Sequence, residues 1–269
     1  MSKWGFALLS AVLIIFLLTM TSCSAKNYET NIYEVKEEFN KILIKTDTAD
    51  ITFLPSDDGK CKVICYEQEK KYHSVEVNNG TLTVKVIDEN EWYDYIGINI
   101  DIPKITVYLP DDLYDSIVIK ESTGDICLER VSALSLDITL STGNVTATDI
   151  TCEGNVTVGV STGEVNLCGL KCKNLISTGS TGKISMKNVI ATEKISVERS
   201  TGDVLFEDSD GAEIFVMTNT GDVKGSLLTN KVFITKTDTG RINIPDSITG
   251  GRCEITTDTG NINISVYED

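Results

Sequence analysis

One short motif recurs along this chain at nearly constant spacing, and it restricts the fold more than any other feature of the sequence. The motif is Ser, Asn or Asp followed by Thr and Gly, and it appears eight times. Its glycines are separated by 19 or 20 residues and stand at Gly124, Gly143, Gly163, Gly182, Gly202, Gly221, Gly240 and Gly260. A fixed period of this length is typical of stacked repeats, in which each unit buries its apolar face against its neighbours.

Apolar residues alternate with polar ones on both sides of each glycine. Around Gly143, Leu136 and Ile138 precede the motif, and Val145 and Ala147 follow it. Alternation with period two predicts strands with one buried face. We therefore predict an all-β fold, a parallel β-solenoid (β-helix) of 19–20-residue coils. Each glycine is expected at a structural turn, because it accepts a positive φ. Eight rungs stacked at about 4.8 Å would span roughly 38 Å.

The region before the first glycine contains a ninth copy of the pattern, with alanine in place of glycine. Residues 46–51 (TDTADI) resemble residues 237–242 (TDTGRI), and the Asn78-Asn79-Gly80 sequence between two alternating runs predicts a hairpin. A solenoid needs covered ends, so the segment 55–115 is predicted to form an N-terminal cap. We divide the chain into a lipoprotein-type signal peptide (1–22), an anchor and linker (23–30), an N-terminal β region with the first rung and cap (31–115), and the repeat solenoid (116–269).

The first residues have the character of an export signal. Lys3 precedes an apolar run over residues 4–20, and a Thr-Ser pair leads into Cys23. Small residues directly before a cysteine resemble a lipobox, which predicts that Cys23 carries a lipid anchor. The protein would then be an outward-facing lipoprotein of a bacterial cell membrane. An uncleaved anchor is the alternative, because about 17 apolar residues lie at the short limit of a spanning helix.

Charge and histidine content exclude several partners. The chain has 24 Lys and Arg against 40 Asp and Glu, a formal net charge of -16. Nucleic-acid binding needs a basic face, so we predict no nucleic-acid partner. The single histidine, His73, excludes multi-histidine metal centres and is interpreted as a packing or surface residue. We predict no metal, no cofactor and no catalytic residue.

Three patterns allow a chemical interpretation beside a structural one. Cys152 and Cys172 each follow a motif glycine by nine residues, so stacking would bring them within disulfide range or leave two buried thiols. The G-x-S-x-G match at residues 159–163 is one more Ser-Thr-Gly corner and lacks the strand-to-helix context of a nucleophile elbow. A group of acidic residues could bind Ca²⁺ or form a solvated corner; it comprises Glu207, Asp208, Asp210 and Glu213.

An acidic and aromatic stretch in the cap is the most suggestive binding feature. Trp92, Tyr93, Asp94 and Tyr95 combine rings that stack on sugars with a carboxylate that accepts hydroxyl hydrogen bonds. These side chains could contact a ligand, or they could cover the open end of the solenoid.

A strand ending in Ile105-Thr106-Val107-Tyr108-Leu109-Pro110, followed by the Thr-Gly array behind an export signal, is similar to one known family. That family is the bacterial "putative adhesin" family of β-strand-repeat proteins, and the resemblance covers about residues 30–265. The resemblance implies an extracytoplasmic β-solenoid of unknown function attached to the envelope, without catalytic residues. Some members resemble accessory components of cell-envelope stress systems.

We predict a non-enzymatic, membrane-anchored protein that offers a binding surface to an envelope glycan or a membrane protein. An accessory factor of a cell-envelope stress sensor is the alternative. A polysaccharide-active enzyme is the weakest candidate, because the coils show no insertion from Gly124 to Gly260 that could wall a cleft.

Overall fold

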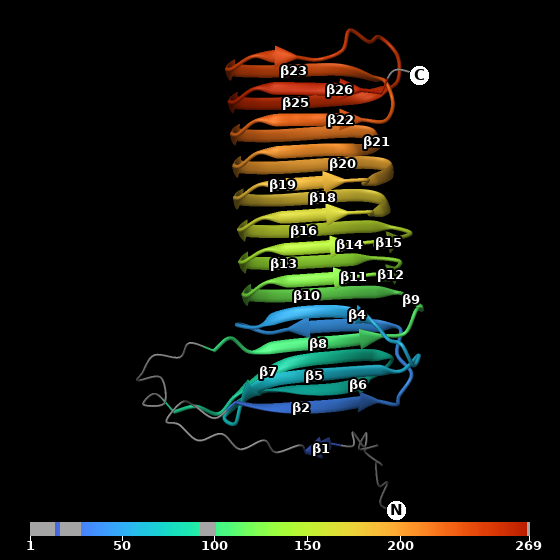
Figure 1. Ribbon diagram of the computed structural model, residues 1–269, viewed down its shortest axis with the longest axis vertical. Helices are drawn as coiled ribbons and strands as arrows, with labels where there is room; N and C mark the ends of the chain where they lie inside the picture. The colour runs from blue at the N-terminus through green and yellow to red at the C-terminus, as the bar shows by residue number, and fades with distance from the viewer. Residues whose placement is uncertain (1–13, 17–27, 92–100, 268–269) are drawn as a thin grey trace, which may run out of the picture.

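The chain folds as an elongated stack of β-coils, seen with its long axis vertical in Figure 1. This computed structural model describes residues 14–16, 28–91 and 101–267. Within these residues every regular element is a strand, as the alternating pattern predicts. The described part of the chain contains no helix that is long and apolar enough to cross a membrane.

Two long ladders of parallel strands form the broad sides of the stack. In spatial order, ladder 1 contains β7 (Thr81–Asp88), β3 (Lys41–Lys45), β10 (Ser116–Thr123), β13 (Leu136–Thr142), β16 (Asn155–Thr162), β18 (Lys171–Thr181), β20 (Ile190–Thr201), β21 (Val204–Thr220), β25 (Gly251–Thr259) and β23 (Lys231–Thr239). Ladder 2 contains β8 (Lys104–Leu109), β4 (Asp50–Pro55), β11 (Ile126–Glu129), β14 (Val145–Thr148), β17 (Val165–Cys168), β19 (Ile184–Lys187), the start of β21, β22 (Val223–Leu227), β26 (Ile262–Val266) and β24 (Ile242–Asn243).

A short third ladder closes the coils on their narrow side. It contains β9 (Leu113–Tyr114), β12 (Ser132–Ala133), β15 (Thr151–Cys152), the starts of β18 and β20, and the middle of β21. Each central coil is therefore three-sided.

Equivalent positions of successive repeats stack directly on one another. Ile119 pairs with Ile138, and Ile138 pairs with Val158. All three side chains are buried, because alternate residues of every strand point inward. Because these positions stack directly, the repeat produces one continuous core along the axis. Each such aliphatic side chain contributes about 1.5–3 kcal/mol on burial.

The motif glycines lie at the corner between ladders 1 and 2, where the chain has φ between +130° and +159°. A Cβ added at Gly143 would lie 1.9 Å from the carbonyl oxygen of Gly124 in the neighbouring rung. Beside this corner, Asp125 Oδ1 accepts a hydrogen bond from the backbone N–H of Asn144 (2.8 Å). Asn144 Oδ1 accepts one from the N–H of Glu164 (2.9 Å), so a polar ladder also holds the rungs in register.

The N-terminal region adds two rungs and a cap. Strands β3 and β4 stack on β10 and β11, with buried Ala49 at the corner between them. Strands β7 and β8 form the next parallel rung. Antiparallel strands then cover this end: β2 (Tyr28–Val35) on β5 (Cys61–Gln68), β6 (Lys71–Asn78) on β7, and β1 (Ile14–Phe16) on β2. The β6–β7 hairpin turns at Asn79 and Gly80, whose positive φ values (51° and 72°) match a two-residue type I′ turn.

At the C-terminal end the spatial order of the rungs departs from their order in the sequence. Strand β25 lies between β21 and β23, and β26 lies between β22 and β24. The polar ladder follows the same exchange, because Asp222 Oδ1 accepts from the N–H of Asn261 (2.8 Å) and Asn261 Oδ1 from that of Arg241 (3.0 Å). The last coil of the sequence is thus internal, and the coil before it forms the tip (Figure 1).

Candidate functional site

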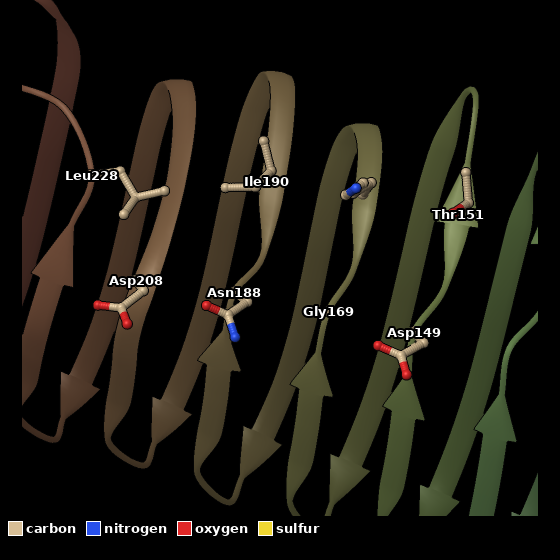
Figure 2. Close-up of a pocket in the computed structure, with 8 residues that line it drawn as sticks. Asp149, Thr151, Gly169, Asn188, Ile190, Asp208 and Leu228 are labelled. Carbon is tan, nitrogen blue, oxygen red and sulfur yellow. The ribbon is translucent and has the colours of Figure 1, made fainter.

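A groove runs along the narrow third side of the solenoid, and Figure 2 shows the residues that line it in two rows. Its volume is about 420 Å³. The first row follows the ends of the ladder 2 strands and contains Asp149, Gly169, Asn188 and Asp208. The second row belongs to the third ladder and contains Thr151, Lys171 and Ile190, with Leu228 at one end of the groove.

Backbone conformation explains why the first row is polar. Asp149, Asn188 and Asp208 have φ of 54°, 51° and 52°, and Gly169 has φ of 68°. Asn and Asp tolerate this left-handed region better than other residues with a side chain, so the corner favours them or glycine, although Arg130 takes the same position and conformation (φ 52°) in the preceding rung. All four residues follow a motif glycine by six positions. The recurrence of Asn, Asp or Gly six positions after a motif glycine is therefore the sequence signal of this row, and it was not among the candidate sites predicted above.

Several polar groups of the groove are available to a ligand. Within the described chain, the side chains of Asp149, Asn188 and Lys171 have no hydrogen bond or ion pair. Asp208 differs, because its Oδ1 accepts hydrogen bonds from the hydroxyls of Tyr267 (2.6 Å) and Ser226 (3.1 Å). The Tyr267 hydrogen bond, followed by that of Ser226, lowers the pKa of the Asp208 carboxyl, which stabilises a carboxylate at this end of the groove.

The acidic corner beside the groove is not gathered into a cation site. Glu207 pairs with Lys187. Asp210 pairs with buried Lys231 (2.6 Å) and accepts a hydrogen bond from Thr229. The carboxylates of Glu207, Asp208 and Asp210 therefore each contact different partners and do not converge on one point. In the described residues, Glu207, Asp208, Asp210 and Glu213 form no group of three with ligand atoms within 4.8 Å of one another.

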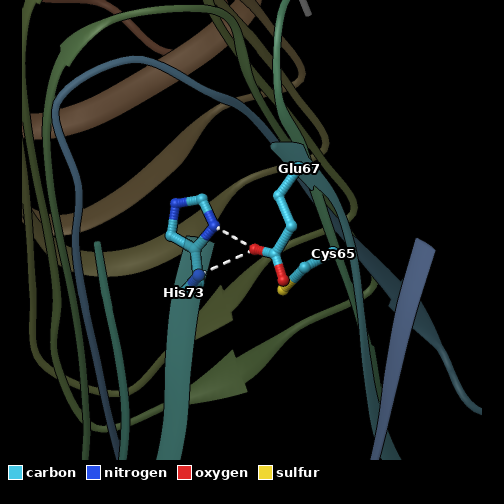
Figure 3. A group of neighbouring side chains, drawn as sticks. All are labelled: Cys65, Glu67 and His73. Carbon is cyan, nitrogen blue, oxygen red and sulfur yellow. Dashed lines mark hydrogen bonds and ion pairs between the residues drawn. The ribbon is translucent and has the colours of Figure 1, made fainter. Parts of the chain in front are cut away.

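The single histidine lies in a buried polar cluster in the cap, shown in Figure 3. Glu67 is fully buried, and its Oε2 accepts hydrogen bonds from the backbone N–H of His73 (2.7 Å) and lies 2.8 Å from His73 Nδ1. Its Oε1 accepts from Asn31 Nδ2 (2.8 Å), and His73 Nε2 lies 3.1 Å from Thr46 Oγ1. These contacts join strands β2, β5 and β6 to the first rung.

The same cluster has the composition of a metal site, but its polar atoms are already engaged. Cys65, Glu67 and His73 form the one trio of such ligands found among the described residues, with ligand atoms within 4.8 Å of one another. Both Glu67 oxygens and both His73 ring nitrogens have protein partners. Burial, followed by the charge of Glu67, raises the pKa of the Cys65 thiol well above its usual value, which disfavours the thiolate that binds metals. The cluster is best explained as a brace within the cap.

A second hollow lies where the cap meets the solenoid and has a volume of about 760 Å³. Phe39 and Tyr114 line it and stack with ring centroids 5.9 Å apart. Charged residues of loops, Lys36, Glu38 and Asp112, share its lining, but they do not recur from rung to rung as the positions of the groove do.

Two of the sites predicted from sequence lie outside the described residues: the lipid anchor Cys23 and the stretch Trp92, Tyr93, Asp94 and Tyr95. Among the described residues of the cap, the Tyr28 hydroxyl donates a hydrogen bond to the carbonyl of Asp101 (2.7 Å). Tyr28 stacks on Tyr66 with centroids 4.8 Å apart, and Lys62 lies 4.6 Å from the ring centre of Tyr108.

The remaining patterns have structural places in the coil. Cys152 and Cys172 are neighbouring buried free thiols, and burial raises the pKa of Cys172 to about 12. Ser161 lies at an exposed corner at the end of β16, not in a strand-to-helix turn.

Comparisons with known proteins find one matching family model and several similar solved structures. A family model described as Toastrack DUF4097 matches residues 39–175 and 154–269. A crystal structure of a "putative adhesin" from Bacteroides fragilis is 19% identical, with a TM-score of 0.47, covering 90% of this chain and 98% of that one. A "putative adhesin" from Parabacteroides distasonis is 13% identical (TM-score 0.44; 88% and 97% covered), and a "putative lipid binding protein" from that organism is 15% identical (TM-score 0.35; 90% and 97% covered). No curated protein matches the chain.

Proposed function

Because the chain belongs to the Toastrack DUF4097 family, whose match spans the whole solenoid, we propose that it is a non-enzymatic, adhesin-like binding protein of the bacterial cell surface. Its ligand-binding surface would be the groove of the third ladder, and its ligand an extended envelope glycan. The observation that carries this proposal is the pair of parallel rows with unengaged polar side chains.

The spacing of the rows favours a repeating polymer. Equivalent backbone positions recur at each rung, about 4.8 Å apart, an interval close to the length of one pyranose unit in an extended glycan. Asp149, Asn188 and Lys171 offer acceptors and donors to sugar hydroxyls, while Ile190 and Leu228 offer apolar contact to the faces of the rings. A polymer lying along the solenoid axis would meet the same kind of contact several times.

The geometry of the groove supports binding without catalysis. Its two carboxylates, Asp149 and Asp208, are three rungs apart, which is roughly 14 Å at about 4.8 Å per rung. Acid and base carboxylates of glycoside hydrolases are separated by roughly 5 to 9.5 Å. The rungs that carry the groove also lack any long loop that could enclose a substrate.

The proposal also includes a lipid anchor on Cys23 and a second glycan contact in the Trp92–Tyr95 stretch. A lipid on Cys23 would hold the N-terminal pole at the membrane, outward-facing, and would tether an acidic body that an anionic bilayer repels. The Trp92–Tyr95 stretch, with rings that can stack on sugars, would add a second glycan contact to that of the groove.

Co-sedimentation of the purified full chain with peptidoglycan, beside affinity capture from native envelopes, tests the proposal. The groove variant is Asp149→Ala with Asn188→Ala. Its matched control makes the same two changes at exposed positions away from the groove, Asp137→Ala with Asn219→Ala. We expect retention by the wild type and the control and loss in the groove variant.

Other outcomes would contradict parts of the proposal. Loss only in a Trp92→Ala variant would move the binding site to the cap stretch. Capture of one membrane protein without retention on glycan would favour an accessory factor of a stress sensor. If neither the wild type nor any variant is retained on glycan, and no partner is captured, a role in the protein's own envelope is refuted. Release of a Cys23→Ser variant from membranes tests the anchor separately.

A further inference from the structure

The exchange of the last two coils leaves the tip of the solenoid without a cap. Strand β23 pairs with β25, and β24 pairs with β26; among the described strands neither has a partner on its outer edge. At the opposite pole, antiparallel strands cover the last parallel rung (Figure 1). Unpaired backbone groups along a nine-residue strand are a template for pairing with another strand.

The tip also exposes aliphatic side chains. Val232 and Ile234 on β23 are 38% and 48% exposed, and Ile242 on β24 is 45% exposed. Ile248, in the loop after β24, is 89% exposed. These four residues lie within 17 positions of the sequence, in the rung that has an open outer edge among the described strands. An apolar group of this kind beside an open edge marks an interaction surface.

The local charge of the tip favours a second copy of this chain as the partner of this surface. The coil at the tip, residues 231–250, carries three cations against two anions, a local charge of +1: Lys231, Lys236 and Arg241 against Asp238 and Asp246. The remainder of the chain therefore carries -17. Two copies of so acidic a protein repel each other over most orientations, but two tips can approach with almost no repulsion.

We propose that the tip binds the tip of a second copy of this chain, with β23 of each copy pairing antiparallel across a two-fold axis. The pairing satisfies the open edges of both β23 strands and buries Ile234 of each copy. A two-fold contact uses the same surface twice and closes at a dimer, whereas contact between a tip and the capped pole would continue into filaments. The two N-terminal poles then point in opposite directions.

This arrangement gives the proposed adhesin a partner on a facing surface. The dimer itself does not depend on the lipid anchor, but its use as a bridge between two membranes rests on the proposed function. With the anchors at opposite ends of the paired solenoids, the dimer would connect two membranes and would not form within one.

Sedimentation velocity of the full chain in detergent, over a wide range of protein concentration, tests the dimer. The variant is Ile234→Lys, which places a charge beside the open edge. Ile176→Lys is the matched control, because Ile176 occupies the same repeat position, six before its glycine, on the same outer face and is 37% exposed. We expect wild type and control to form dimers with the same Kd. The Ile234→Lys dimer should be at least about tenfold weaker, since the axis presents the change twice.

Circular dichroism and unfolding curves equal to wild type establish that Ile234→Lys folds. A monomeric wild type, an unchanged dimer in Ile234→Lys, equal loss in Ile176→Lys, or oligomers that keep growing with concentration would each overturn the proposal. Aggregation of vesicles that carry the lipidated chain tests the bridge alone. If vesicles stay dispersed while the dimer forms in detergent, the failure belongs to the proposed adhesive function and not to the tip contact.

Discussion

Replacing a motif glycine in the middle of the stack should open the contact between rungs as well as strain the turn. Gly163 has φ of +144°, and a Cβ there would lie 1.7 Å from the carbonyl oxygen of Gly143. The backbone strain in Gly163→Ala costs about 1–3 kcal/mol. Relief of the overlap requires these two rungs to separate, which weakens the hydrogen bonds that join them, from Gly143 N to Thr162 O and from Val145 N to Glu164 O, each worth about 1 kcal/mol.

The expected loss is about 3–5 kcal/mol, and a protein of this size shifts its Tm by roughly 2–4 °C per kcal/mol. Gly163→Ala should therefore lower Tm by roughly 6–20 °C, measured by circular dichroism on heating. Gly59→Ala is the control, because Gly59 has φ of +69° but no atom within 4 Å of an added Cβ. That change should cost only the left-handed strain of about 1–2 kcal/mol. Equal losses in the two variants would refute the close-contact explanation.

Three further predictions concern buried polar groups. Glu67→Gln should destabilise the fold by about 3 kcal/mol in urea unfolding, because an amide N–H₂ would face donors from Asn31 or His73; an unchanged midpoint would contradict the brace. Burial raises the pKa of Glu121 to about 7, so the unfolded state is the stronger acid and stability should fall by up to about 3 kcal/mol as pH rises from about 4.5 to 7. Glu121→Gln should flatten that part of the pH profile. Arg199→Met should raise stability by about 1–3 kcal/mol, since Arg199 is buried with one hydrogen bond, to Ser177, and no ion pair; a lower Tm would contradict this.

The sequence predicts the fold well because each rung repeats the environment of the one before it. Once Ile119, Ile138 and Val158 are recognised as equivalent, their burial and direct stacking follow from period two and a fixed coil length. The repeat also predicts the first row of the groove, because its corner residues all stand six positions after a motif glycine. The burial of Arg199 also left a signal in the sequence. Ser177 takes an inward position that Ile138 and Val158 fill in earlier rungs, and Gly179 replaces the Val160 of the rung before it. A Cβ at Gly179 would lie 2.0 Å from Arg199 Nη1.

The buried cluster in the cap left no such signal. Glu67 and His73 lie on adjacent strands, and their partner Asn31 is 36 residues from Glu67 in the sequence. No periodicity connects these residues, because each strand of the cap occurs once. Their contact depends on how antiparallel strands fold back on the first rungs, and single-copy tertiary contacts of this kind cannot be read from a repeat pattern.

The exchanged order of the last coils also could not be predicted from the sequence. Here the reason is the opposite one: the repeats are too similar to one another. Val223 pairs with Ile262 in the structure, whereas chain order would pair it with Ile242. Both are isoleucines at the same repeat position, so ladder pairing and core burial barely distinguish the two arrangements. The difference lies in what each order leaves at the tip. Chain order would expose the coil that contains Cys253, Ile255 and Ile262, all of which are buried in the observed order. The exchange instead exposes the coil of Ile234 and Ile242, whose surroundings are nearly neutral, and so it determines which surface a second copy can meet.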